Sequence, residues 1–343
     1  MIPRLAALAN SRANNFQLIR LLAAAAVVFF HSYALTNHWT DEPLWQRIPE
    51  FNFGALGVSC FFVISGFLVT KSWLARKRFV PFVAARVLRI YPALIGAVVL
   101  TLVLAGASSA LDWRSFLAHP QTIDYVLHVT PAWEMKYRLP GAFATNPMPD
   151  VNGSLWTLPI ELRLYIAVLL AGIVGMLARP RILLSAFLAV LAVFVLPPGW
   201  LAMPAFDAAT KDLVVLFALG SLAWVWREAI PVSLALAAVV VLLLILNPAD
   251  LARGVLFAPL LAYLVFVAAY LPRLQWPAFN RVGDYSYGLY VYAFPIQQTL
   301  VERIPGLDPL PLFALSLALT LGAAIVSWHG LEQPALRLKS RFT

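Results

Sequence analysis

Charged side chains and cysteine are both scarce in this sequence. Asp, Glu, Lys and Arg make up 12% of the 343 residues, whereas hydrophobic residues make up 62%. Soluble domains carry about 25% charged and about 45–50% apolar residues, so the composition excludes an ordinary soluble fold. The single cysteine, Cys60, cannot form an intrachain disulfide, and it lies in an apolar run that predicts a small buried side chain.

Acidic residues are the scarcer of the charged groups, which leaves a formal charge of +9. In a soluble protein this excess would suggest a nucleic-acid partner. In a membrane protein it indicates cytoplasmic loops, where Lys and Arg accumulate. We therefore expect membrane lipid, and no nucleic acid, around this chain.

Long apolar runs fill most of the sequence and predict an all-α membrane protein with about ten transmembrane helices. The first run follows Arg4 and Arg12 and loosely fits a signal peptide, but it continues to Leu35, which is long enough for a spanning helix. No internal repeat is evident, so the inverted-repeat design of many transporters is not indicated. The expected spans are 16–36, 54–73, 88–108, 157–178, 182–197, 210–226, 231–246, 254–271, 285–301 and 311–330.

The distribution of basic residues predicts the orientation of these spans. Most of the 25 Lys and Arg fall in alternate connecting segments, which places both termini in the cytoplasm and the protein in the inner membrane. We expect one integral-membrane domain over 1–343, with a basic cytoplasmic loop at 71–89 and a long extracytoplasmic loop at 109–156. Long loops in compact proteins are often functional.

Few ionisable residues lie within the expected spans, and such residues usually mark functional sites. His31 follows Arg20 by eleven residues, close to three helical turns, so both project from nearly the same face of one helix. Glu161 is expected at a similar depth, where its carboxylate would orient the His31 imidazole. A neutral histidine that only packs against a neighbouring helix is the alternative, and Arg163 gives Glu161 a possible structural partner.

Two groups of polar or aromatic residues are candidates for substrate binding. Ser286, Tyr290, Ala293 and Gln297 share one helical face, which predicts either the lining of a cavity or a hydrogen-bond network between helices. The loop at 109–156 carries tryptophans that would sit at the membrane interface or stack on sugar rings. These are Trp113, Trp133 and Trp156.

Five segments together resemble the acyltransferase-3 family of membrane O-acyltransferases, in the family's order and over nearly the whole chain. Each segment alone is weak, because small residues and arginines in apolar runs are common. The segments are Arg20 through His31, Gly57-Val58-Ser59-Cys60-Phe61-Phe62-Val63-Ile64-Ser65-Gly66-Phe67, Arg86-Val87-Leu88-Arg89-Ile90-Tyr91-Pro92, Trp156-Thr157-Leu158 with Glu161, and Glu332-Gln333-Pro334.

This resemblance implies transfer of an acyl group, commonly acetyl, from cytoplasmic acyl-CoA to a hydroxyl of a cell-surface or lipid-linked carbohydrate. It implies that acyl-CoA, here expected to be acetyl-CoA, is a co-substrate, and no metal is predicted. The resemblance assigns His31 and Arg20 to catalysis and Arg86 and Arg89 to the CoA phosphates. Together with the polar residues above, we expect Glu161 to take part in catalysis, Tyr91 and Ser65 to bind the donor, and Trp156, Tyr290 and Gln297 to bind the carbohydrate acceptor.

One position departs from the family pattern. Many members carry a histidine in a Tyr-x-x-His-x-Pro arrangement, and this chain has Ala293 between Tyr290 and Pro295. No role of that second histidine can therefore be carried over. A transporter or flippase of a lipid-linked sugar is the alternative function, and a membrane scaffold is a further one. Neither explains Arg86 and Arg89 together with Arg20 and His31.

Overall fold

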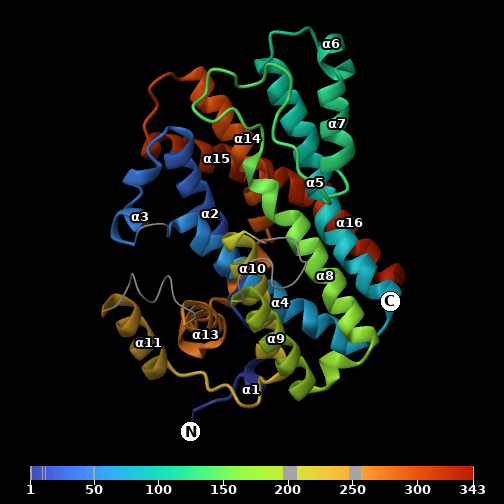
Figure 1. Cartoon of the computed structure of the whole chain (residues 1–343), viewed down its shortest axis with the longest axis vertical. Coiled ribbons are helices and arrows are strands. Elements are labelled where there is room, and N and C mark those ends of the chain that lie inside the picture. The colour runs from blue at the N-terminus through green and yellow to red at the C-terminus, as the bar shows by residue number, and fades with distance from the viewer. Residues whose placement is uncertain are drawn as a thin grey trace. The chain divides into compact units, whose positions relative to one another are not determined.

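The computed structural model describes residues 2–9, 11, 13–48, 51–195, 207–246 and 256–342. These residues form helices and connecting segments without a β-strand, and one isolated bridge joins Arg4 to Pro231 (Figure 1). The expected all-α architecture is confirmed.

Each of the ten apolar segments coincides with a helix in the described residues. Positions 196–197 and 254–255 of two expected spans lie outside those residues. The helices are α2 (Phe16–Leu35), α4 (Phe53–Arg76), α5 (Phe79–Ser108), α8 (Leu158–Ile173), α9 (Pro180–Val195), α10 (Ala208–Val225), α11 (Leu234–Leu246), α13 (Phe257–Tyr270), α14 (Ser286–Arg303) and α15 (Pro309–Ser327).

Within the described residues, six helices are long and apolar enough to cross a membrane. They are α2, α4, α5, the segment Gly153–Ile173 that includes α8, α10, and the segment Pro309–Phe342 that begins with α15. Three more are apolar but shorter, namely Pro180–Phe194, α11 and α13. Helix α14 is in neither group, because tyrosines, glutamines and its charged C-terminal end lower its hydropathy.

The segment expected as a basic loop at 71–89 is mostly helical. Helix α4 continues to Arg76 and α5 begins at Phe79, so only Lys77 and Arg78 lie between the two helices. The loop prediction was wrong here because apolar residues between the charges, and the absence of glycine, allow both helices to extend. The segment 109–156 is also partly helical, with α6 (Trp113–Ala118), α7 (Pro120–Val129) and the 3₁₀ turn η2 (Gly153–Thr157).

The chain forms two compact units, each built from three separate segments. Unit 1 comprises 1–19, 58–82 and 163–281, and unit 2 comprises 20–57, 83–162 and 282–343. Helices α2, α4, α5 and α8 each contain a boundary between the units. Residues far apart in the sequence therefore meet within one unit, and the candidate site residues are described below unit by unit.

Unit 1 is held together by close helix packing between α4 and α10. Gly66 lies against the backbone of Phe217, and Gly220 lies against the backbone carbonyl of Val63. Small residues allow such close approach between membrane helices. Phe67 follows Gly66 and packs its ring against aromatic rings from other parts of unit 1, those of Phe16, Trp224, Phe266 and Tyr270.

Unit 2 is organised around α14, which packs along α15 (Figure 1). Gly288 of α14 lies against Ala324 of α15, so the two backbones approach closely. Helix α14 is buried over most of its length, from Ser286 to Gln298. A polar helix in this position is tolerated because its polar side chains bond to other helices rather than facing lipid.

Candidate active site

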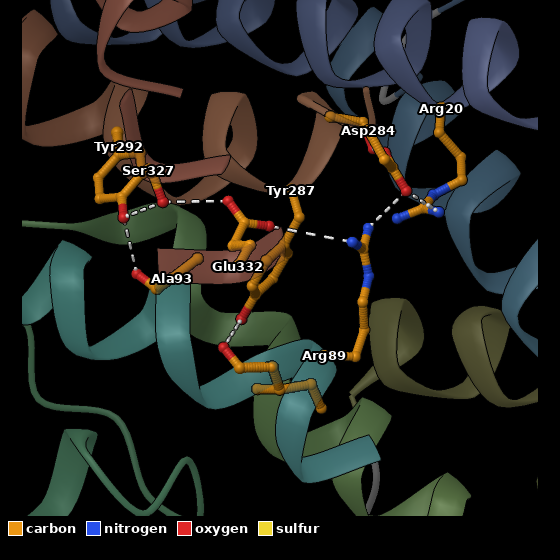
Figure 2. A network of polar contacts seen from close by, with 10 residues as sticks. Arg20, Arg89, Ala93, Asp284, Tyr287, Tyr292, Ser327 and Glu332 are labelled. Carbon is orange, nitrogen blue, oxygen red and sulfur yellow. Dashed lines mark hydrogen bonds and ion pairs between the residues drawn. The ribbon is translucent and has the colours of Figure 1, made fainter. Parts of the chain in front are cut away.

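An ion-pair cluster in unit 2 joins α2 and α5 to the residues that precede α14. Asp284 Oδ2 accepts from Arg20 Nη1 at 2.7 Å and from Arg89 Nη2 at 2.8 Å (Figure 2). Asp284 Oδ1 accepts from the Ser286 hydroxyl at 2.6 Å. The carboxylate thus balances two arginines that come from different helices, near the start of α2 and in the N-terminal half of α5.

The cluster continues from Arg89 to the C-terminal helices. Arg89 Nη1 lies 3.9 Å from Glu332 Oε2, and Glu332 Oε1 accepts from the Ser327 hydroxyl at 3.0 Å. Tyr292 donates its hydroxyl towards Ser327 Oγ at 2.8 Å and the Ala93 carbonyl at 3.2 Å (Figure 2). Arg89 of α5 thus contacts Asp284 and Glu332 directly, and through Asp284 it is connected to Arg20 of α2.

The surroundings of Asp284 determine its charge. Burial on its own would raise the pKa of this carboxyl, but the charges of Arg20 and Arg89 and the hydrogen bonds from Ser286 outweigh burial and hold the pKa at about 2. Asp284 lies two residues before the start of α14. Because its pKa is so low, it is a carboxylate throughout the physiological pH range.

Glu332 lies in a local irregularity of the helix. Residues Trp328–Glu332 form one turn of π-helix, labelled η6, between α15 and α16 (Gln333–Arg337). Single π-helical turns are rare and often occur at functional sites, because they redirect side chains. Here the turn ends at Glu332, whose side chain is almost fully buried and points to Arg89 and Ser327.

His31 lies on the same face of α2 as Arg20, as the spacing predicts, and this face packs on α14. The His31 ring contacts the Phe294 ring at a centroid distance of 5.1 Å in an edge-to-face arrangement. Its Nδ1 atom is buried, and no described residue forms a hydrogen bond with it. Among the described residues, Glu161 accepts no hydrogen bond from this atom, and the orientation of His31 by Glu161 stays a prediction.

Three further buried polar atoms lack a hydrogen-bond partner among the described residues around Phe294. They are Gln297 Oε1, Asn152 Oδ1 and Ser154 Oγ. The Gln297 amide nitrogen donates to the Val28 carbonyl at 3.0 Å and the Ser32 hydroxyl at 2.8 Å, on the two sides of His31.

Asn152 is fixed beside the same part of α14. Its amide nitrogen donates to the Val291 carbonyl at 2.9 Å, and the neighbouring Gly153 packs directly on the Phe294 ring. Buried polar atoms are normally satisfied, so these unsatisfied atoms, from residues next to or on α14, make this part of unit 2 a candidate for binding a polar ligand.

The polar face of α14 forms hydrogen bonds between helices, one of the two alternatives that the sequence left open. The Tyr290 hydroxyl bonds to Thr157 Oγ1 at 2.8 Å, and Glu161 lies within electrostatic range of Tyr290. Ala293 is buried beside them. Trp156, which precedes Thr157, is partly exposed.

The residues expected at the donor site are distributed over both units. Arg86 and Arg89 lie one helical turn apart on α5 in unit 2. The Tyr91 hydroxyl donates to the Pro131 carbonyl at 2.9 Å in the same unit. Ser65 belongs to unit 1, where its hydroxyl lies 3.0 Å from that of Tyr165.

Sequence reasoning left Asp284, Ser327 and Glu332 out of the expected site. Asp284 was visible as an ionisable residue at the edge of a span, and Arg20 in an apolar segment required a counterion. Ser327 gave no signal, because a single serine in an apolar helix is common. In the described residues, no group of three or more His, Cys, Asp and Glu is placed to hold a metal ion.

The chain is an all-helical protein with several apolar helices, and it belongs to the acyltransferase domain family whose model matches residues 14–329. It is 29% identical to an O-acetyl transferase of Shigella phage Sf6, over 96% of this chain and 98% of that protein. It is 28% identical to nodulation protein 10 of Rhizobium leguminosarum bv. viciae, over 95% of this chain and 94% of that protein. No solved structure matches the chain significantly.

Proposed function

We propose that this membrane O-acyltransferase transfers an acetyl group from acetyl-CoA to a hydroxyl of a cell-surface or lipid-linked carbohydrate. Family membership and the O-acetyl transferase relative support acyl transfer to oxygen. The observation that carries the proposal is the buried Nδ1 of His31, which has no hydrogen-bond partner among the described residues. We place the protein in the inner membrane, where a donor from the cytoplasm can meet an acceptor that is exposed outside.

In this proposal His31 is the general base. Its free ring nitrogen takes the proton of the carbohydrate hydroxyl while the hydroxyl oxygen attacks the thioester carbonyl carbon. The carbon–sulfur bond then breaks, the CoA thiolate leaves, and the imidazolium returns a proton to it. General-base assistance of this kind contributes about 10²–10⁴ in rate.

The neighbouring polar atoms suit the acceptor hydroxyl. Gln297 Oε1 and Asn152 Oδ1 are available to accept a hydrogen bond from that hydroxyl, and each side chain is fixed by a bond from its own amide nitrogen to a helix backbone. Preorganised groups of this type orient a substrate at little entropic cost. Trp156 and Tyr290 are assigned to the sugar. Glu161, which lies within electrostatic range of Tyr290, is assigned to catalysis.

The arginines of α5 take separate roles in this proposal. Arg89 is already bound to two carboxylates, so it positions α2, α5 and α14 around the site. Arg86, one turn earlier, is assigned with Tyr91 of the same unit to the donor, and its guanidinium suits a CoA phosphate. Arg20 holds the N-terminal part of α2 through Asp284 and thereby fixes the helix that carries His31.

The experiment is an acetyl-transfer assay with detergent-purified protein, radiolabelled acetyl-CoA and a carbohydrate fraction from the envelope of the cells that produce the protein. We expect acetate on the carbohydrate with the wild type and a loss of at least about a hundredfold with His31→Ala. His128→Ala is the matched control, because His128 is a partly exposed histidine that pairs with Asp124. A flippase without acyl transfer would leave acetyl-CoA unconsumed in every sample.

A further inference from the structure

Unit 1 contains two adjoining clefts of opposite character between α9, α10 and α13. One has a volume of about 870 Å³ and lies where the segment before α9 meets the end of α10. The other has a volume of about 380 Å³ and lies between the three helices. Trp226, which ends α10 and is 39% exposed, lines both. The two clefts therefore adjoin at Trp226.

The larger cleft is basic. Arg179 and Arg181 flank Pro180 at the start of α9, and Arg227 faces them from the end of α10. Glu228 is the single acidic residue among those that line it. Three guanidinium groups against one carboxylate leave a net positive site, and arginine is the side chain best suited to bind phosphate oxygens.

Arg227 is held in place by its surroundings. It donates to the Trp224 carbonyl at 2.8 Å and lies over the Trp224 ring at 4.5 Å, and Lys71 lies over that ring at 5.1 Å. Arg4 donates to the Ala229 carbonyl at 2.7 Å at the edge of the same cleft. These contacts hold Arg227 at the cleft and place Arg4 and Lys71 close to it.

The smaller cleft is apolar. Leu184 of α9, Leu219 and Leu222 of α10, and Phe266 of α13 line it, and Tyr263 supplies one of its few polar atoms. Leu184 lies about one helical turn after Arg181. A ligand that fills both clefts must therefore carry a negative head and a hydrocarbon chain within one molecule.

We propose that this pair of clefts binds an anionic membrane phospholipid, with the phosphate at Arg179, Arg181 and Arg227 and an acyl chain along α9 and α13. Basic pockets between transmembrane helices on the cytoplasmic side are typical sites for such head groups. The distribution of basic residues places these arginines on that side. A nucleotide would fit the basic cleft, but it would leave the apolar one uncovered.

The test is native mass spectrometry of the full-length protein in an uncharged detergent, titrated with phosphatidylglycerol or with phosphatidylcholine of the same acyl chains. We expect tighter binding of phosphatidylglycerol, and weaker binding as salt is raised, because salt screens exposed charges. Arg179→Gln with Arg181→Gln should weaken phosphatidylglycerol binding by roughly tenfold to thirtyfold. Both arginines are exposed, so we expect this double variant to fold.

Arg337→Gln with Arg341→Gln is the matched control, because these two arginines are also exposed but lie outside the cleft. The control should bind phosphatidylglycerol like the wild type. Equal affinity for the two lipids, or equal losses in both double variants, would overturn the proposal.

Two competing ligands test whether the acyl chain is needed for binding and whether the bound lipid is a phospholipid. Glycerol phosphate should not displace phosphatidylglycerol, because it has no chain for the apolar cleft. Displacement by glycerol phosphate at matched concentration would show that the apolar cleft is not used. A polyprenyl phosphate that binds where phosphatidylglycerol does not would assign the clefts to a lipid-linked acceptor and contradict the phospholipid proposal.

Discussion

Arg20 and Asp284 are 264 residues apart in the sequence, and Nη1 of Arg20 lies 2.7 Å from Oδ2 of Asp284. The pair joins the helix that carries His31 to the helix that carries Phe294, and His31 contacts Phe294 further along the same two helices. The ion pair therefore fixes how α2 and α14 align. Through Arg89 it also includes α5 and, less directly, Glu332.

Asp284→Asn should lower the stability of the protein more than a comparable surface change. Removing one partner of a buried ion pair leaves uncompensated charge and costs about 3–5 kcal/mol, and here two arginines lose their shared carboxylate. Thermal unfolding in detergent measures the effect. Asp150→Asn is the control, because Asp150 is more exposed and pairs only with Arg138 among the described salt bridges.

The pH dependence of this effect follows from the lowered pKa of Asp284. Because the folded-state pKa is about 2, below the usual 3.8, the stabilisation is fully present above about pH 4 and is lost as the pH falls through about 2. The difference in melting temperature between wild type and Asp284→Asn should thus stay constant between pH 5 and 8 and shrink in stronger acid. A difference that changes steadily between pH 5 and 8 would contradict the assignment of Asp284.

Arg86→Gln and Arg89→Gln should have different consequences although the residues are one turn apart. Arg89→Gln removes contacts to Asp284 and Glu332, so we expect lower thermal stability together with lower activity. Arg86→Gln should mainly raise the KM for acetyl-CoA, because a charge-assisted contact to phosphate is lost. Steady-state kinetics at varied salt and melting curves separate the two. The same profile for both variants would refute this division of roles.

The apolar segments were predictable because each must satisfy its backbone internally, and a helix does so without help from the rest of the chain. The face shared by Arg20 and His31 was predictable for the same local reason. Which carboxylate balances Arg20 was not, because Asp284, Glu161 and Glu332 were all available and only tertiary packing selects one. The π turn before Gln333 also depends on packing, not on residue type.

Gly66→Ala should destabilise the protein, whereas Gly322→Ala should not. A methyl group at Gly66 would meet the backbone of Phe217, which cannot move without separating α4 from α10. Overpacking of this kind typically costs about 1–3 kcal/mol. Gly322 is also inside a helix, but nothing lies within 4 Å of the position of an added methyl group. There alanine should be neutral or slightly stabilising, since it favours helix more than glycine does.

The direction in which the chain crosses the membrane can be tested with single cysteines at Arg78 and Thr145 in a Cys60→Ser background. Both positions are exposed, one between α4 and α5 and the other in the segment between α7 and η2. The sequence 71–89 has basic residues and no acidic ones, whereas Asp112, Asp124, Glu134 and Asp150 balance the basic residues of 109–156. The positive-inside rule therefore predicts that position 145 lies outside and position 78 in the cytoplasm.

A membrane-impermeant thiol reagent applied to intact cells or spheroplasts should label Thr145→Cys, and it should label Arg78→Cys only after the membrane is permeabilised. The reverse pattern would put the segment before η2 on the side of the donor, and transfer across the membrane would have to be replaced by acylation within the cytoplasm.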